Sequence, residues 1–292
     1  MAGTFLSYDV VDVFAEAPFA GNQLAVVHGA GALDDAAMLA ITREFGYSET
    51  TFPVPVDAGR YAVRIFTLDG EVPFAGHPTL GTAWVLRERG ALTGSSAVQQ
   101  CGAGDIGVAF ADDLVELTAA PRDLLGPLPV AAAEPLLDEL GLSAADLDGD
   151  AWVAGTGLTF VHLPVTDDAV VRARVGRTHV RAITDLPATT DPLEGINLYA
   201  AQSSDDGADV HSRVFVLGTE DPATGSAAAG LGMALTARGL LVGGDRYRIR
   251  QGIELGRPSL LLGTVEVTDG AATAVRVAGQ VHPIARGEIR VP

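Results

Sequence analysis

A short segment that occurs twice, about half a chain apart, constrains the fold more than any other feature of the sequence. Residues 78–83 read Pro-Thr-Leu-Gly-Thr-Ala and residues 222–227 read Pro-Ala-Thr-Gly-Ser-Ala, an offset of 144 positions (222 − 78) in a chain of 292. Each copy follows a β-patterned run and opens a helical stretch of small residues. A repeat at the same point of two similar cycles is typical of duplication. We therefore expect two similar domains related by pseudo-symmetry.

Short β-patterned runs and a few helices alternate in both halves, which predicts an α+β fold. Helical spacing and terminal glycines predict helices over residues 34–45, 78–89, 134–140 and 222–238. The expected strands cover residues 5–14, 23–28, 50–56, 61–67, 98–100, 106–110, 114–117, 152–164, 196–202, 212–217 and parts of 247–291. A stretch rich in proline and alanine, 120–133, is expected to be a linker. The predicted domains are therefore residues 1–120 and 130–292, and the last strand is a candidate to pair back with the first domain.

The charge balance argues against several classes of partner and mechanism. Nineteen basic and 37 acidic residues give a net charge of −18, which repels nucleic acid and anionic membrane surfaces. All 19 basic residues are arginine, so the chain offers neither a Schiff-base lysine nor a P-loop lysine. We expect a small-molecule partner, with no nucleic acid and no membrane involved.

The sequence is typical of a soluble cytoplasmic protein. The first residues lack the basic segment and the cleavage site of a signal peptide. The most apolar later stretch, 227–242, is too short to span a bilayer. Cys101 is the only cysteine, so an internal disulfide is excluded, and we assign it no role.

The first copy of the repeat is a candidate binding site for an anion. Gly76, His77 and Pro78 form a turn between a strand and a helix, with the proline expected at the first helical position. Free N–H groups at a helix start and the helix dipole suit a carboxylate, and His77 would lie beside it. The alternative is that His77 only caps the helix or forms a hydrogen bond within the core.

The second copy offers a matching helix start. Asp221 precedes Pro222, and Thr224, Gly225 and Ser226 fall within the first turn. Asp221 is a candidate catalytic residue, but an N-cap role explains its position equally well. Ser226 is a candidate substrate contact or simply a small residue for close packing. Two helix starts that face one cleft would bind a carboxylate through backbone donors.

Glu49 is the candidate acid/base. It lies where the first helix gives way to the next strand, in the segment Ser-Glu-Thr. Carboxylates at such junctions are mostly solvated. If Glu49 is instead buried in a cleft, its pKa should rise, which would let one group both take and return a proton.

Two other kinds of site are not expected. Residues 102–107 match the spacing G-x-G-x-x-G, but strand and turn patterns follow where a dinucleotide site needs a helix. We interpret this segment as a hairpin loop. The six histidines are scattered without ligand spacing, so we predict no metal site.

Several of these segments together resemble the PhzF family of phenazine-biosynthesis-type isomerases, which has the diaminopimelate epimerase fold. They are Asp-Val-Phe at 12–14, Phe-Ala-Gly-Asn at 19–22, Ser-Glu-Thr at 48–50, Phe-Ala-Gly-His-Pro-Thr-Leu-Gly at 74–81, Glu-Asp-Pro-Ala-Thr-Gly-Ser at 220–226, Gln-Gly at 251–252 and Gly-Arg-Pro at 256–258. They occur in the family's order. Gln23 departs from the proline that the family commonly has after Gly-Asn.

The resemblance implies two pseudo-symmetric domains, each a barrel-like sheet around a central helix, with the active site between them. It also implies a homodimer that needs no cofactor. Glu49 matches the family's general acid/base, Gly76 and His77 its Gly-His substrate contact, and Asp221 and Ser226 the acid and the serine of its second motif. Related epimerases use two cysteines, at positions that look like Ala75 and Pro222 here, so two-thiol epimerisation is not expected.

The leading hypothesis is an isomerase that moves a proton on a small carboxylated substrate, with Glu49 as the base. A non-catalytic protein that binds small acids on the same fold is an alternative. An amino-acid racemase or epimerase without a cofactor is a further alternative. The sequence names neither the substrate nor the dimer interface.

Overall fold

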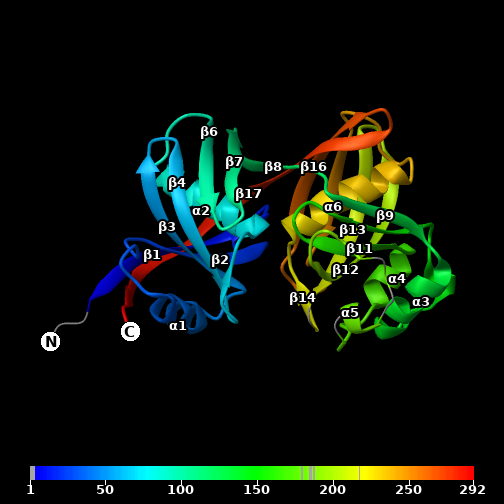
Figure 1. The fold of residues 1–292 in the computed structure, drawn as a ribbon, viewed down its shortest axis with the longest axis horizontal. Coiled ribbons are helices and arrows are strands. Elements are labelled where there is room, and N and C mark those ends of the chain that lie inside the picture. The colour runs from blue at the N-terminus through cyan, green and yellow to red at the C-terminus, as the bar shows by residue number, and fades with distance from the viewer. Residues whose placement is uncertain (1–3, 179, 184–185, 187, 217) are drawn as a thin grey trace. The chain divides into compact units, whose positions relative to one another are not determined.

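The computed structural model describes residues 4–292 apart from 179, 184–185, 187 and 217. The chain divides into two compact units, drawn in Figure 1. Unit 1 comprises Met1–Thr118 together with Ala278–Pro292, and unit 2 comprises Ala119–Val277. Strands and helices alternate in both, as the sequence predicts for an α+β fold. Within the described residues, no helix has both the length and the apolar character that a membrane span requires.

Unit 1 is a curved sheet with one helix buried among its strands and one helix outside. Its elements are β1 (Phe5–Val13), β2 (Asn22–Val27), α1 (Asp35–Phe45), β3 (Glu49–Asp57), β4 (Arg60–Thr67), β5 (Glu71–Val72), α2 (Gly76–Glu88), β6 (Ser96–Cys101), β7 (Gly104–Ala111) and β8 (Leu114–Ala119). Parallel pairing joins β2 to β3 and β4 to β6, and antiparallel pairing joins β1 to β2, β3 to β4 and β6 to β7. The mixed pairing closes the strands around α2 (Figure 1).

Unit 2 repeats this pattern. Its elements are β9 (Asp123–Leu128), α3 (Val130–Glu139), the 3₁₀ turn Ala144–Asp146, β10 (Ala151–Gly155), β11 (Thr159–Pro164), α4 (Asp167–Arg172), α5 (Val180–Ile183), β12 (Leu193–Ser204), β13 (Gly207–Val216), β14 (Thr219–Asp221), α6 (Gly225–Ala237), β15 (Arg246–Gln251), β16 (Ser259–Thr268) and β17 (Ala271–Arg290). Parallel pairing joins β11 to β12 and β13 to β15, in the places that β2–β3 and β4–β6 occupy in unit 1. The helix α6 corresponds to α2.

The two buried helices show why the repeated segments are rich in small residues. A Cβ atom added at Gly81 of α2 would lie 2.6 Å from a methyl group of Leu24 and 2.8 Å from one of Val13. A Cβ atom at Gly232 of α6 would lie 2.5 Å from the hydroxyl of Tyr247. Both helices are buried on nearly every side, and glycine lets the surrounding strands approach them closely.

The helix starts differ from the prediction. Both helices have 13 residues, and they begin at Gly76 and Gly225, an offset of 149 (225 − 76) rather than 144. Pro78 is the third residue of α2, where its missing N–H would have had no intrahelical partner in any case. Pro222 lies outside α6, between β14 and the N-cap residue Thr224. The sequence match therefore aligned residues that are not structurally equivalent.

The predicted linker is also wrong, because residues 120–133 contain β9 and the beginning of α3. Leu124 and Leu125 of β9 pair with Ala154 and Val153 of β10. Leu125 packs against the core of unit 2, and Leu128 is buried within it. Proline is tolerated in such a strand at positions where no backbone N–H is needed to pair with the neighbouring strand.

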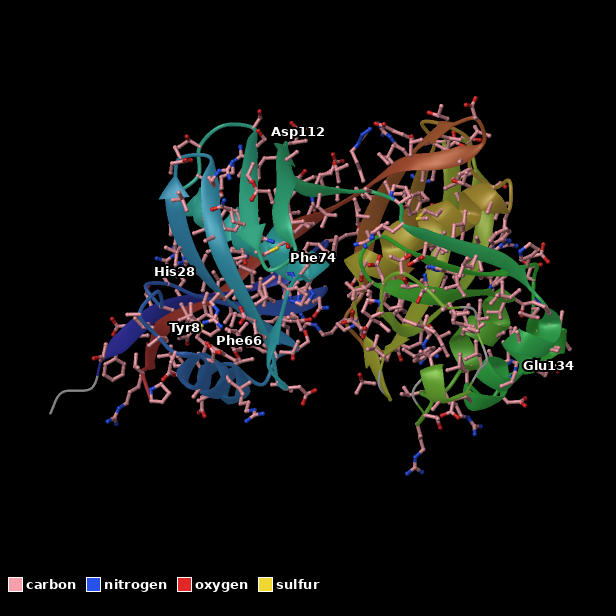
Figure 2. All side chains as sticks on the ribbon, in the orientation of Figure 1. Tyr8, His28, Phe66, Phe74, Asp112 and Glu134 are labelled. Carbon is pink, nitrogen blue, oxygen red and sulfur yellow. The ribbon has the colours of Figure 1, made fainter. Side chains whose placement is uncertain are left out.

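The outer helix α1 covers a separate apolar cluster in unit 1. Met38 and Ile41 of α1 pack with Phe52 and Phe66 on the sheet, and the two phenylalanine rings meet edge to face. Tyr8 makes an edge-to-face contact with Phe45, near the end of the helix. Tyr8 and Phe66 are labelled in Figure 2. Helical spacing predicted a helix over residues 34–45, and α1 covers Asp35–Phe45.

The strand β17 belongs to both units, and a buried carboxylate fixes its second half in unit 1. Its residues from Val281 to Arg290 pair antiparallel with β1. Asp9 on β1 accepts hydrogen bonds from Arg286 on β17 (2.8 Å) and from Arg89 at the end of α2 (2.6 Å), and it lies 2.8 Å from the imidazole of His28. Burial alone would raise the pKa of Asp9, but the hydrogen bonds from Arg89 and His28 outweigh it and lower the pKa.

Replacing Asp9 by asparagine should destabilise the protein by about 3 kcal/mol at pH 7, because the cations around the site lose their buried partner. Urea unfolding measures the change. A lowered pKa makes the contribution of Asp9 fully present above its unfolded pKa of 3.8 and lost as the pH falls through the folded-state pKa, so the difference between the two proteins should begin to shrink only below about pH 4.

The control is Asp105→Asn, which removes an exposed ion pair with Arg60 in the same unit. It should change the free energy of unfolding by less than about 0.5 kcal/mol. Equal effects of the two substitutions would contradict a special role for Asp9.

Candidate active site

Glu49 is a buried carboxyl group at the first position of β3. Its side chain is 18% exposed, and its Oε2 atom has no hydrogen-bond partner among the described residues. Burial raises the pKa of Glu49, and a hydrogen bond with Ser48 only partly opposes that rise. The solvated alternative considered for a strand junction is therefore wrong for this residue. A carboxyl group with a raised pKa is suited to taking and returning a proton.

His77 lies directly beside Glu49. It is the second residue of α2, its side chain is 6% exposed, and its Nε2 atom is 3.5 Å from Oε2 of Glu49. On the other side of the ring, Nδ1 is 3.3 Å from Nδ2 of Asn22, the first residue of β2. Three buried polar side chains from three different elements thus form a continuous row.

The loop that leads into Asn22 is held in an unusual backbone conformation. Phe14, Phe19 and Gly21 all have positive φ values, 61°, 68° and 67°. A Cβ atom at Gly21 would lie 2.4 Å from the carbonyl oxygen of Val13, so only glycine fits there. The N–H of Phe19 donates to the buried carboxylate of Asp12 (2.8 Å). Strain of this kind is concentrated at functional sites, and here it fixes the position of Asn22.

A buried chain of hydrogen bonds supports the start of α2. The hydroxyl of Thr79 donates to the carbonyl of Ala75 (2.8 Å), and the amide of Gln99 donates to that hydroxyl (2.8 Å). Tyr61 donates in turn to Oε1 of Gln99 (3.0 Å). The first turn, which carries Gly76 and His77, is therefore tied to β4 and β6.

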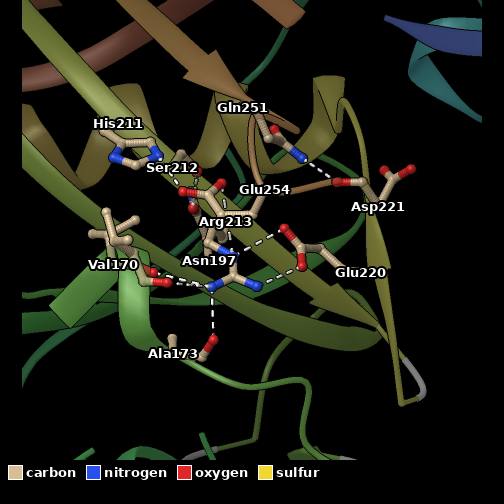
Figure 3. Close-up of polar contacts among 11 residues, drawn as sticks. Val170, Ala173, Asn197, His211, Ser212, Arg213, Glu220, Asp221, Gln251 and Glu254 are labelled. Atoms are coloured by element: carbon tan, nitrogen blue, oxygen red, sulfur yellow. Dashed lines mark hydrogen bonds and ion pairs between the residues drawn. The ribbon is translucent and has the colours of Figure 1, made fainter. Parts of the chain in front are cut away.

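In unit 2, Asp221, Thr224 and Gln251 form a compact polar group at the start of α6. Figure 3 shows the contact between Gln251 and Asp221. The hydroxyl of Thr224 donates to the carboxylate of Asp221 (2.5 Å). The amide nitrogen of Gln251 donates to the backbone carbonyl of Asp221 (2.8 Å), and its oxygen accepts from the N–H of Thr224 (3.2 Å). Thr224, not Asp221, is the N-cap residue of α6. The N-cap alternative for Asp221 is therefore wrong.

Glu220, beside Asp221, belongs to a buried ion pair. Arg213 on β13 donates two hydrogen bonds to Glu220, of 3.0 and 2.7 Å, and the two side chains are only 7% and 2% exposed. The same guanidinium donates to the carbonyls of Val170 and Ala173 at the end of α4 (Figure 3). This bidentate pair fixes the β13–β14 hairpin that carries Asp221.

The predicted site residues fall into one group in each unit. Unit 1 brings Glu49 and His77 together, with Gly76 as the first residue of α2. Unit 2 brings Asp221 and Thr224 together, with Gly225 and Ser226 as the first two residues of α6. The roles of all seven residues stay predictions.

Two polar residues at these sites received no role from the sequence. Asn22 contacts His77, and Gln251 holds both Asp221 and Thr224. Each adjoins a glycine with positive φ, Gly21 and Gly252. A polar residue next to a glycine was therefore the feature of the sequence that could have indicated each of them.

The glycine-rich segment at residues 102–107 is a hairpin, as predicted. Cys101 of β6 pairs with Gly104 of β7. The N–H of Ala103 donates to the carbonyl of Pro73 (3.1 Å), and a Cβ atom at Gly102 would lie 2.9 Å from Cα of Pro73. The hairpin thus packs on the loop that precedes α2.

Replacing Glu49 by glutamine should make the protein more stable at neutral pH. The folded-state pKa of Glu49 lies above its unfolded value of about 4.5, so between the two values the folded protein holds more protons and its stability falls as the pH rises. Glutamine removes this cost, and urea unfolding should show the two proteins converging below about pH 4.5.

The matched control is Glu44→Gln, at an exposed position near the end of α1, five residues before Glu49. It should leave the free energy of unfolding within about 0.5 kcal/mol of the wild-type value at every pH. A glutamine at position 49 that destabilises the protein at neutral pH would contradict the burial argument.

Comparisons with known proteins identify the family. The model of the family described as "Phenazine biosynthesis-like protein" (PhzC-PhzF) matches residues 11–287. A trans-2,3-dihydro-3-hydroxyanthranilate isomerase of Pseudomonas fluorescens is 34% identical, over 97% of this chain and 99% of its own. The structure of a predicted epimerase from Pseudomonas aeruginosa is also 34% identical, with a TM-score of 0.80 over 97% of this chain and 99% of its own.

A more distant match concerns the fold alone. A hydroxyproline epimerase from Agrobacterium vitis is 14% identical, with a TM-score of 0.61 over 98% of this chain and 93% of its own. The two pseudo-symmetric units thus have the diaminopimelate epimerase-like fold that the motifs predicted. The match to the family model over nearly the whole chain and the full-length likeness to an isomerase show that this chain is an isomerase of the PhzF family.

Proposed function

We propose that the protein is a cofactor-independent isomerase that moves a proton between two carbon atoms of a small carboxylated substrate, with Glu49 as the group that takes and returns the proton. The observation that carries this proposal is the burial of Glu49 beside His77, at 3.5 Å. A buried carboxyl group with a raised pKa exchanges a proton with carbon more readily than a solvated carboxylate does.

The proposed reaction is balanced without any other reagent. The Glu49 carboxylate takes a proton from one carbon, and the C–H electron pair shifts into the adjacent conjugated system. The protonated Glu49 then returns the proton to a second carbon, where a new C–H bond forms. Since one proton leaves and returns, the product is an isomer of the substrate.

Backbone donors at the helix starts are the proposed contacts for the substrate carboxylate. Gly76 opens α2, while Thr224, Gly225 and Ser226 mark the start of α6. The first turn of a helix presents N–H groups without intrahelical partners, and the helix dipole favours an anion there. Such donors would let a chain with a net charge of −18 bind an acid. Asp221, with its hydrogen bond from Thr224, is the proposed second polar group of the reaction.

A dihydro-hydroxyanthranilate is the first substrate to test, since the isomerase from Pseudomonas fluorescens is named for one. Proton transfer by two thiols is not proposed, because Cys101 is the only cysteine of the chain. The homodimer and the cytoplasmic location stay predictions from the sequence.

Glu49→Gln should lower kcat on trans-2,3-dihydro-3-hydroxyanthranilate by about 10²–10⁴-fold, because glutamine keeps the shape and loses the basic oxygen. In D₂O the wild-type protein should introduce deuterium at the carbon that receives the proton whenever the protonated Glu49 exchanges with solvent before it returns its proton, and the Gln variant should not. Mass spectrometry and NMR of the product measure both effects.

Glu44→Gln is again the control and should retain wild-type turnover. Near-normal turnover by the Glu49 variant would rule out Glu49 as the base. Chiral analysis of the product separates double-bond movement from racemisation, since only the latter yields the mirror-image centre.

Turnover should survive prolonged dialysis against EDTA and removal of small molecules by gel filtration. The expectation follows from the absence of lysine and of a dinucleotide fingerprint. Loss of activity in the dialysed protein, restored by one metal ion or organic cofactor, would show that it is wrong.

A further inference from the structure

The row Asn22–His77–Glu49 contains information about where the imidazole proton lies. The Nδ2 atom of Asn22 faces Nδ1 of His77 at 3.3 Å. An amide nitrogen donates and does not accept, so Nδ1 must be the acceptor. The proton of the neutral ring then lies on Nε2, the atom 3.5 Å from the Glu49 carboxylate.

Unit 2 contains a second asparagine–histidine pair, and its further contacts determine which ring nitrogen carries the proton. Nδ2 of Asn197 faces Nδ1 of His162 at 3.1 Å, and Nε2 of that ring is 3.4 Å from the carbonyl oxygen of Ala154. A carbonyl only accepts, so Nε2 must carry the proton. The hydroxyl of Ser212 donates to Oδ1 of Asn197 (2.6 Å), which orients the amide with its nitrogen toward the ring.

We propose that Asn22 is a positioning residue that holds His77 as its Nε2–H tautomer, so that the protonated nitrogen of the ring is the one that lies 3.5 Å from the Glu49 carboxylate. The inference rests on the proposed role of Glu49 as the base. With the proton on Nε2, the side of His77 that faces the carboxylate has no lone pair with which to compete for the substrate proton. The opposite tautomer would place two acceptors face to face.

In this arrangement Glu49, His77 and Asn22 have different roles. Glu49 exchanges the proton, His77 places a protonated nitrogen 3.5 Å from the Glu49 carboxylate, and Asn22 sets the tautomer of His77 from the far side of the ring. The strained loop before Asn22, with Phe19 and Gly21 at positive φ, gives the amide a defined position. A second group that fixes a histidine tautomer is a recurring device in acid/base sites.

The wild-type protein labelled with ¹⁵N-histidine provides a test that needs no substrate. Long-range ¹H–¹⁵N correlation spectra distinguish a protonated ring nitrogen from an unprotonated one, and the His77 signals are those lost in His77→Gln among the six histidines. We expect Nε2 protonated and Nδ1 unprotonated at pH 7.5. A protonated Nδ1, in either the other tautomer or the imidazolium ion, would overturn the proposal.

Asn22→Asp replaces the donor by an acceptor of the same shape, so Nδ1 of His77 should become protonated. The matched control is Asn197→Asp, which should alter the His162 signals and leave those of His77 unchanged. An Asn22→Asp protein that folds and keeps Nδ1 unprotonated would refute the inference. If that variant does not fold, the wild-type spectrum alone decides.

Activity links the tautomer to the reaction. Asn22→Asp should lower kcat by about tenfold or more with a much smaller change in KM, because the substrate contacts remain. A changed tautomer with unchanged kcat would remove the positioning role. A wild-type protein inactive on the tested acid, with the expected tautomer in the spectrum, would count against the proposed function and leave the tautomer assignment standing.

Discussion

Close contact between a buried helix and the strands around it is the constraint on which each unit depends. Gly81 in α2 and Gly232 in α6 lie where any side chain would collide with a neighbour. Packing at that distance fixes how far each helix extends along its sheet, and therefore where its first turn emerges. The candidate site residues occupy that first turn or touch it. The packing of the core therefore also determines the geometry of the candidate site.

The duplicated units use the same framework for different side chains. In unit 1 the hydroxyl of Tyr61 lies 3.5 Å from the backbone carbonyl of Thr79 in α2, and in unit 2 the hydroxyl of Tyr247 donates to the backbone carbonyl of Ala228 in α6 (3.0 Å). The two carbonyl groups are 149 positions apart (228 − 79), the same offset as between the helix starts. At the second helical position, however, unit 1 has His77 and unit 2 has Ser226. An invariant scaffold with variable first-turn residues explains how one fold supports different proton-transfer sites.

Sequence reasoning predicted what depends on local pattern. The apolar spacing of α1, the alternation of the strands and the hairpin at Cys101 could all be predicted from neighbouring residues. The linker could not, because β9 is a strand only through its pairing with β10, and the helix starts were displaced because Pro222 suits several turn positions equally well. Burial of Glu49 and the contact of Asn22 with His77 depend on distant segments and left no periodic signal.

The division of β17 between the units has a consequence for how the chain acquires its structure during synthesis. Unit 1 needs residues 278–292, and the Asp9–Arg286 hydrogen bond joins positions 277 apart. All of unit 2 is therefore translated before β1 can pair with β17, and until then one edge of β1 has unpaired backbone N–H and C=O groups. Unit 2 begins later in the chain, but all of its residues have been synthesised before those of unit 1. Unit 1 is complete only after residues 278–292 have been added.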